Sequence, residues 1–182
     1  MASFQKYFLA LVPEGELQER VTALKMQLKE EFNCKYALKS PAHVTLKMPF
    51  SYNEAKEETL IQSLSGFLKS YSKISLKVEG VGTFGDRVIY LKIDAGEDLF
   101  DLQRELKLYC KRELKLVDEL SDRNFHPHMT IAFKDLKKAH IPNILEVVKM
   151  KPISYDFVSS QLFLLKRENV RWEIIKKIVF GG

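Results

Sequence analysis

The sequence feature that most constrains the fold is a pattern that occurs twice along the chain. A histidine, an apolar residue and a threonine begin a short apolar segment at His43 and again at His128. The spacing between matching points stays near one value: 85 positions for His43 and His128, 81 for Gly15 and Gly96, and 79 for Ile74 and Ile153. A nearly constant offset indicates an internal duplication, and two copies are too few for a repeat array. We therefore expect residues 1–182 to form one two-lobed domain.

Each copy is predicted to run strand, helix, strand, helix and two further strands. In the first copy, apolar residues at spacings of four and three predict a helix over about 14–32, after a strand at 4–12. Prolines bound the second strand at 42–48, and capping-box spacing from Ser51 to Glu54 starts the second helix. The remaining predicted elements are strands at 74–81 and 87–93, a helix with an apolar face from Leu99 to Tyr109, a strand at 128–133, a helix at 144–150, and strands at 153–157, 161–166 and 172–180.

Two copies of this unit predict an α+β fold. We expect two lobes related by a pseudo-twofold axis, each with a mostly antiparallel sheet and with helices on the outer face of that sheet. Because the two His-x-Thr strands occupy equivalent points of the copies, the axis would bring both to one groove between the lobes.

Composition excludes several classes of protein. An apolar content of 46% over 182 residues is too high for a disordered tail, and the longest apolar runs are too short to cross a membrane. The N-terminus enters a strand directly, without the regions of a signal peptide, so we expect a cytoplasmic protein. The net charge of +5 favours an anionic partner only weakly. We expect a monomer without membrane contact and without a stable protein partner.

The cysteines and histidines argue against a disulfide and against a metal centre. Cys34 and Cys110 lie in segments predicted as helix or helix end, and free thiols are the expectation. The chain has four histidines, and none has the short paired spacing of a zinc site. His126 and His128 could clamp a metal, but Pro127 interrupts the strand and no carboxylate lies at a helpful spacing. We expect no metal and no cofactor.

The two His-x-Thr strands predict which side chains share a surface. Alternate side chains of a strand point to the same face, so His43 and Thr45 would face the groove while Val44, Leu46 and Met48 enter the core. The same alternation would place His128 and Thr130 on the groove. Each lobe would then present one imidazole and one hydroxyl.

Two imidazoles that face each other across a groove suit phosphodiester hydrolysis. A neutral histidine can take a proton from water as it attacks phosphorus, while a protonated histidine gives a proton to the departing oxygen. The threonine hydroxyls can donate hydrogen bonds to the phosphate oxygens as charge develops. One His-x-Thr motif arises easily by chance, but both copies begin a strand after a proline and recur at the repeat offset. The symmetry does not decide which histidine is the acid.

These residues resemble the 2H phosphoesterase superfamily, whose hallmark is a pair of His-x-Thr/Ser motifs followed by an apolar residue. The motifs here are His43-Val44-Thr45-Leu46 and His128-Met129-Thr130-Ile131, and Phe125-His126-Pro127-His128 is similar to the lead-in of the second motif. The chain looks most like the bacterial and archaeal "2′-5′ RNA ligase" branch, which resembles RNA 2′,3′-cyclic phosphodiesterases. That resemblance implies opening of a terminal cyclic phosphate to a 2′-phosphate. It makes His43 the acid on O3′, His128 the base that activates water, and Thr45 and Thr130 the holders of the phosphate.

The sequence departs from this branch where the phosphate charge is neutralised. Members often carry an arginine shortly after the second histidine, and this chain has Ala132-Phe133-Lys134. Lys47 shares the groove-facing side of its strand with His43 and could supply a cation, as could Lys134 or Arg123. Three aromatic residues could stack on a base or ribose, or pack in the core: Phe50, Phe84 and Phe163.

Other functions stay open at this point. The same site could act on 2′-5′-linked oligonucleotides or on a cyclic phosphate of ADP-ribose, and its reverse reaction would be 2′-5′ ligation of RNA. A different class would be a nucleotide- or RNA-binding module without turnover, although intact histidines in both motifs speak against it. The expected partners are RNA ends with a 2′,3′-cyclic phosphate, or small nucleotides.

Overall fold

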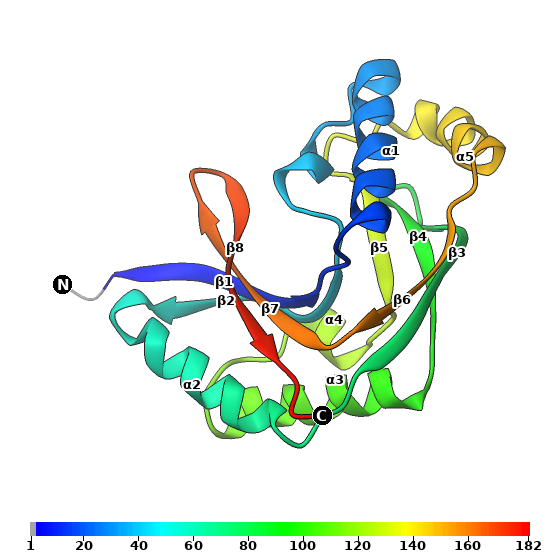
Figure 1. The fold of residues 1–182 in the computed structure, drawn as a ribbon. Coiled ribbons are helices and arrows are strands. Elements are labelled where there is room, and N and C mark those ends of the chain that lie inside the picture. Colours follow the sequence, from blue (N-terminus) through cyan, green and yellow to red (C-terminus); the bar gives the residue numbers. More distant parts are fainter. Residues whose placement is uncertain (1–2) are drawn as a thin grey trace.

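Two four-stranded antiparallel sheets form the framework of the protein, whose residues 3–182 are described by a computed structural model (Figure 1). We name them sheet A, with the order β2-β1-β7-β8, and sheet B, with the order β5-β4-β3-β6. Sheet A consists of β1 (Phe4–Leu11), β2 (Val44–Asn53), β7 (Gln161–Glu168) and β8 (Arg171–Val179). Sheet B consists of β3 (Ile74–Phe84), β4 (Val88–Ala95), β5 (His128–Phe133) and β6 (Ser154–Ser159). Sheet A therefore joins the first and last strands of the chain.

The helices pack on the sheets in a crossed arrangement. The helices are α1 (Glu16–Phe32), α2 (Glu57–Leu68), α3 (Glu97–Arg112), α4 (Leu120–Arg123) and α5 (Ile141–Met150), with short 3₁₀ helices η1 (Tyr36–Lys39), η2 (Glu54–Lys56) and η3 (Lys138–His140). Helix α1 connects two strands of sheet A but packs against β5, whereas α3 connects two strands of sheet B but packs against β2. Figure 1 accordingly shows α1 with α5 on one side of the molecule and α2 with α3 on the other. This arrangement confirms the predicted α+β architecture of two antiparallel sheets with helices.

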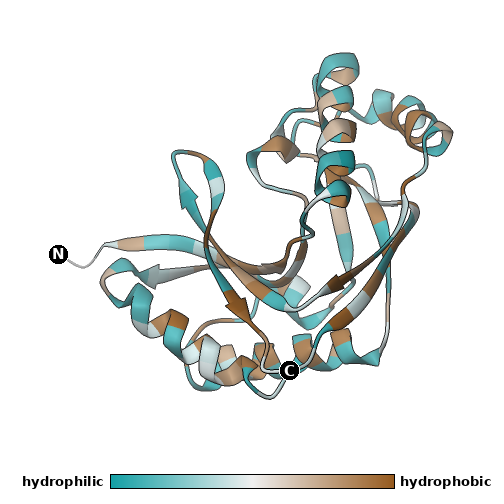
Figure 2. Ribbon diagram, viewed as in Figure 1, coloured by the Kyte–Doolittle hydropathy of each residue, from teal (hydrophilic) through white to brown (hydrophobic). Residues whose placement is uncertain are grey.

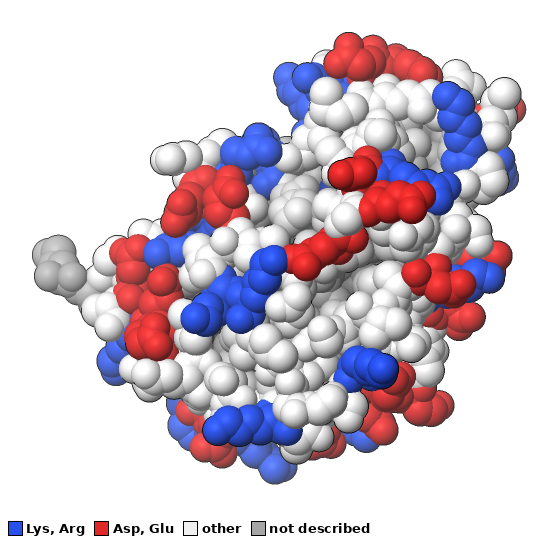
Figure 3. Space-filling model, viewed as in Figure 1, with Lys and Arg blue, Asp and Glu red and all other residues white. Residues whose placement is uncertain are grey.

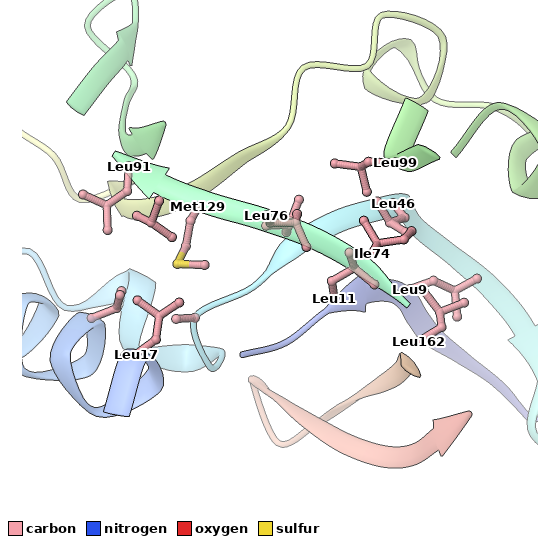
Figure 4. Packing of buried hydrophobic residues seen from close by; sticks show 14 of the residues in the cluster. Leu9, Leu11, Leu17, Leu46, Ile74, Leu76, Leu91, Leu99, Met129 and Leu162 are labelled. Carbon is pink, nitrogen blue, oxygen red and sulfur yellow. The ribbon is translucent and has the colours of Figure 1, made fainter. Parts of the chain in front are cut away.

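The core explains why the helices cross. Figure 4 shows Leu17 of α1 beside Met129 and Leu91 of sheet B, while Leu99 of α3 lies near Leu46 of sheet A. All five side chains are buried, and they belong to one apolar cluster that includes residues of both sheets. The helices are hydrophobic along one side and hydrophilic along the other (Figure 2). Burial of these apolar sides therefore holds the two sheets together.

Two predicted boundaries are wrong. The second strand does not stop at Pro49 but continues to Asn53, because β2 is an edge strand and its proline needs no partner on the open side. Ser51 consequently lies in β2 and caps no helix, and the predicted helix begins instead with η2 at Glu54 and continues as α2. Asn53 instead accepts a hydrogen bond from the backbone of Ala55 at 3.1 Å and caps η2.

Two more features bear on what the sequence indicated about thiols and membranes. Cys34 and Cys110 are free and buried, as predicted. Burial raises the pKa of the Cys110 thiol to about 12 and also raises the pKa of Cys34, so both stay protonated. Among residues 3–182, no helix combines the length and the apolar character that a membrane crossing requires.

Candidate active site

Both His-x-Thr motifs line one cleft. The cleft has a volume of about 540 Å³, and its lining includes His43, Thr45, His128 and Thr130. Thr45 lies on β2 of sheet A and Thr130 lies on β5 of sheet B, so each sheet contributes one motif to the cleft. The structure thus brings together the four side chains that the repeat predicted to share a groove.

Each histidine is held by the same kind of hydrogen bond. Nδ1 of His43 lies 2.7 Å from the carbonyl oxygen of Pro41, and Nδ1 of His128 lies 2.7 Å from that of His126. A carbonyl oxygen only accepts, so Nδ1 carries the hydrogen in both rings. The neutral rings therefore keep Nε2 without a proton, as an atom that can accept one. A bond to the backbone two residues earlier also fixes the direction of each ring.

Burial sets the protonation of both histidines in the free protein. Desolvation lowers the pKa of His43 to about 4, against a raising effect of the Pro41 carbonyl, and the positive charges of Lys25 and His128 lower it further. Desolvation also lowers the pKa of His128, and the charge of His126 adds to this. Both rings are therefore neutral near pH 7 until a ligand brings negative charge into the cleft.

Aromatic rings flank both imidazoles. The ring centroids of Phe8 and His43 lie 5.0 Å apart, and those of Phe84 and His128 lie 4.9 Å apart. Phe84 also stacks on Tyr90 at 4.3 Å and keeps 38% of its surface exposed. The structure therefore places Phe84, a predicted stacking residue, at the cleft. Trp172 lies edge-on to Phe8 at 4.8 Å and lines the same cleft.

The prediction for Lys47 is wrong. Two register irregularities occur where β2 pairs with β1 near this residue, and they break the strict alternation on which the prediction depended. Lys47 is fully buried, forms an ion pair with Asp122 and donates a hydrogen bond to the carbonyl of Val117 at 2.8 Å. Met48, which was expected in the core, lines the cleft instead.

Three further predicted binding residues lie elsewhere. Arg123 lines a separate surface hollow beside the end of α3, and its side chain is not part of the cleft lining. Phe50 is buried and stacks on Tyr7 at 6.0 Å. Phe163 is buried with Phe8 in a second apolar cluster beneath the cleft. Of the three candidate cations, only Lys134 reaches the cleft.

His126 lies beside the cleft but is not part of its lining. Its ring lies 6.4 Å from that of His128 and its Nε2 lies 3.4 Å from the hydroxyl of Tyr90. Over residues 3–182, His, Cys, Asp and Glu side chains form no group of three that could hold a metal ion.

Sequence reasoning missed several residues of the cleft. Tyr36 and Lys39 come from η1, Arg167 and Trp172 come from the β7–β8 hairpin, and Ser121 comes from α4. None of these residues belongs to a motif or to a spacing that repeats. Trp172, at the start of the last strand, is the one of these residues that stands out in the sequence. The sequence does not indicate which face of the strand carries its side chain.

The buried Lys47–Asp122 pair was also missed. Asp122 accepts hydrogen bonds from the backbone of Met48 at 2.7 Å and of Glu119 at 2.9 Å in addition to Lys47. Because Lys47 follows the first motif and Asp122 precedes the second, this pair fastens α4 to β2. The two residues lie 75 positions apart, so no local pattern could have paired them.

Beyond the histidines the cleft borders on a smaller hollow. This hollow has a volume of about 190 Å³ and lies between β2 and residues 121–128. Its lining includes Met48, Phe84, Asn124 and Phe125, and among the described residues that line it there is no lysine or arginine. The larger cleft is lined by Lys6, Lys39, Lys134 and Arg167. The two ends of the site therefore differ in charge.

Comparisons with known proteins agree with this architecture. The family model of the 2′-5′ RNA ligase superfamily matches residues 13–171. A "Putative phosphoesterase" of Bacillus licheniformis is 26% identical over 97% of this chain and 99% of its own length. One of Bacillus cytotoxicus is 30% identical over 97% of both chains. The crystal structure of E. coli LigT complexed with 3′-AMP superposes with a TM-score of 0.67 at 17% identity, covering 99% of this chain and 100% of LigT. With its two His-x-Thr motifs on one cleft, the chain belongs to the 2′-5′ RNA ligase superfamily of 2H phosphoesterases.

Proposed function

We propose that this protein is a metal-independent phosphodiesterase that hydrolyses the 2′,3′-cyclic phosphate of RNA ends or nucleotides to a 2′-phosphate. The observation that carries the proposal is the matched pair of histidines. Both rings donate Nδ1–H to the backbone and both belong to the same cleft, so each has an Nε2 for proton transfer. Two such nitrogens supply the base and the acid that a phosphodiester displacement needs.

The reaction balances with these groups alone. Nε2 of His128 takes a proton from water as the oxygen of that water forms a bond to phosphorus. The bond between phosphorus and O3′ breaks, and Nε2 of His43 gives its proton to O3′. The products are a 2′-phosphate and a 3′-hydroxyl, with the net addition of one water. Thr45 and Thr130 donate hydrogen bonds to the phosphate oxygens. If the 5′-hydroxyl of a second RNA end replaces water as the nucleophile, the same two proton transfers release O3′ and join the ends through a 2′-5′ bond.

The substrate would supply the charge that this mechanism requires. His43 is neutral in the free protein because burial lowers its pKa, so it must gain a proton before it can act as an acid. The negative charge of a cyclic phosphate beside the ring favours the charged form of the imidazole. Binding of the substrate and protonation of His43 are then linked.

The comparisons support a nucleotide as ligand. E. coli LigT has been crystallised with 3′-AMP, with ATP, with NADP⁺ and with phosphate. All four ligands carry at least one phosphate, as the cationic cleft of this chain would favour. We extend the proposal to a role in RNA processing, in a monomeric cytoplasmic enzyme built by an internal duplication.

The test is hydrolysis of adenosine 2′,3′-cyclic phosphate and of a short RNA with the same end group, with EDTA present. Phosphorus NMR distinguishes a 2′-phosphate from a 3′-phosphate product. We expect a 2′-phosphate from both substrates. No turnover of either substrate would reject the proposed activity, and a 3′-phosphate would reject the assignment of O3′ as the leaving oxygen.

A further inference from the structure

The cleft carries more positive charge than the two proposed proton transfers use. Four cations line the cleft: Lys6, Lys39, Lys134 and Arg167. Within residues 3–182 none of these four takes part in a salt bridge, and no acidic side chain belongs to the cleft lining. On the face in Figure 3, by contrast, lysines and arginines are interspersed with acidic side chains. Unpaired cations in a cleft indicate a site for an anion.

Lys166, the neighbour of Arg167 on β7, has its positive charge neutralised by two carboxylates. Nζ of Lys166 lies 2.6 Å from Glu54 and 2.9 Å from Glu57. Successive side chains of a strand point to opposite faces, so Lys166 meets carboxylates on one side while Arg167 lines the cleft on the other. The missing counter-charge is therefore specific to the cleft face.

Tyr36 contacts two of these cations. Nζ of Lys134 donates a hydrogen bond to the Tyr36 hydroxyl at 2.9 Å, and Nζ of Lys134 and of Lys39 each lie 4.4 Å from the centre of its ring. The bond from Lys134 and the charges of Lys39 and Arg167 lower the pKa of the Tyr36 hydroxyl. An aromatic ring attracts ammonium groups to its face, so Tyr36 holds the lysines near each other despite their repulsion.

The segment that bears Tyr36 and Lys39 is fixed in place. Asp135 accepts hydrogen bonds from the backbone of Lys35 at 2.9 Å and of Tyr36 at 2.8 Å. The buried Nζ of Lys25 donates to the carbonyls of Ala37 at 3.1 Å and Ser40 at 3.3 Å. Arg171, at the start of β8, donates to the carbonyl of Leu38 at 3.1 Å. A four-residue 3₁₀ helix with so many outside bonds is preorganised, which lowers the entropy cost of binding a ligand.

We infer that Tyr36, Lys39, Lys134 and Arg167 form a second anion subsite, which binds a phosphate group of the substrate other than the one that is hydrolysed. The inference rests on the proposed function, because it assigns the scissile phosphate to the two histidines. Those residues need one phosphate only, and the cations of η1 and the hairpin are not required for either proton transfer. The smaller hollow beside His128, whose described lining has no lysine or arginine and includes Asp122, suits a nucleobase better than a phosphate.

This subsite narrows the substrate class. In an RNA end, the ribose that carries the cyclic phosphate also carries a phosphate on its 5′ oxygen, which links it to the rest of the strand. A free nucleoside 2′,3′-cyclic phosphate lacks that group. The preferred substrate is therefore a 5′-phosphorylated nucleotide or oligonucleotide end, and a cyclic mononucleotide without a 5′-phosphate is a poor one.

The experiment compares two substrates that differ by one phosphate. The substrates are adenosine 2′,3′-cyclic phosphate and the same molecule phosphorylated at the 5′ oxygen, and the readout is the ratio of their kcat/KM values. A charge-assisted contact to phosphate predicts a ratio of at least about ten in the unmodified protein. Lys39→Gln and Arg167→Gln should each lower this ratio by about three- to tenfold, and the double variant should bring it near one.

A matched control removes the same charge outside the cleft. Lys73 is exposed between α2 and β3, and Lys73→Gln should leave both kcat/KM values unchanged. An equal fall of the ratio in Lys73→Gln would mean that general surface charge, rather than the subsite, attracts the substrate. Measurements at two salt concentrations would strengthen that distinction, since exposed charges are screened more.

A binding measurement separates the subsite from the reaction. Calorimetry compares adenosine 2′-phosphate with adenosine 2′,5′-bisphosphate, which need no turnover. We expect tighter binding of the bisphosphate by at least about tenfold, lost in the double variant. If both cyclic substrates are hydrolysed with a ratio near one and both ligands bind equally, the subsite is wrong while the proposed function stands. If neither substrate is hydrolysed, the proposed function fails, and the binding ratio alone decides the subsite.

Discussion

The two walls of the cleft carry the same pair of side chains, a histidine and a threonine, in different surroundings. On the sheet A wall, His43 is bound to the carbonyl of Pro41 and lies against Phe8. On the sheet B wall, His128 is bound to the carbonyl of His126 and lies against Phe84. The hydrogen bond that holds each ring thus has the same kind of partner and the same length of 2.7 Å on both walls. What differs is the second layer around each ring.

That second layer is specific to each wall. Beside His43 lie Phe8, which contacts Trp172 of the β7–β8 hairpin, and the buried Lys25, whose charge lowers the pKa of His43. Beside His128 lie Tyr90 and His126, and η1 packs against β5, the strand that carries His128. The surroundings of the two rings therefore differ, although each ring makes the same kind of hydrogen bond to the backbone.

The largest effect is expected from removing either histidine. His43→Ala and His128→Ala should each lower kcat for adenosine 2′,3′-cyclic phosphate by about a hundred- to ten-thousandfold, since each removes one proton transfer. Thermal unfolding should change little, because each ring makes one side-chain hydrogen bond worth about 1 kcal/mol. A variant with near-normal turnover would break the equivalence of the two walls and the two-histidine mechanism with it.

The buried pair that exists on one wall only should control stability. Asp122→Ala leaves Lys47 buried with the Val117 carbonyl as its remaining partner, and should lower the free energy of unfolding by about 3–5 kcal/mol. Urea titration followed by circular dichroism measures this change.

Lys47→Met is the matched comparison for that pair. It should cost less, because Asp122 keeps two backbone N–H donors. Equal losses from both variants would show that the contact is a simple charge pair and not the anchor of α4.

The threonines should matter less than the histidines and equally on both walls. Thr45→Ala and Thr130→Ala should each lower kcat by about ten- to a thousandfold, since each removes one hydrogen-bond donor to the developing charge. Thr45→Ser and Thr130→Ser serve as controls that keep the hydroxyl. An unchanged rate in one alanine variant would mean that only one wall holds the phosphate.

The repeated parts of the molecule were predictable from sequence and the unrepeated parts were not. The spacing from His43 to His128 predicted the shared cleft. In the first helix, the apolar residues from Leu17 to Leu28 recur every three or four positions, and they are buried as this helical spacing predicted. Strand alternation failed at Lys47, where β2 is irregular. The internal duplication itself stays a prediction.

The cations that line the cleft show more fully which contacts could not be predicted from the sequence. Lys39 and Arg167 lie more than a hundred positions apart, and they line one cleft because η1 packs against β5 while β7 pairs with β1 in sheet A. Lys134 was predicted from its place after the second motif, although its contact with Tyr36 was not. Local patterns specify strands and helices, whereas contacts between distant loops depend on the finished packing.

The pH dependence of kcat/KM tests the comparison of the two walls through the smallest of the expected effects. Both histidines have a lowered pKa in the free protein, and the reaction needs one of them protonated and the other neutral. That form is most abundant between the two pKa values, so kcat/KM should be highest below pH 6.5 and should fall by about tenfold per pH unit at higher pH. Lys25→Met removes a positive charge that lowers the pKa of His43. The pKa of His128 is lowered by burial and by His126 instead. The substitution should move the acid limb of the profile to higher pH and leave the alkaline limb in place. A profile with its maximum above pH 7 would contradict the protonation states assigned to both walls.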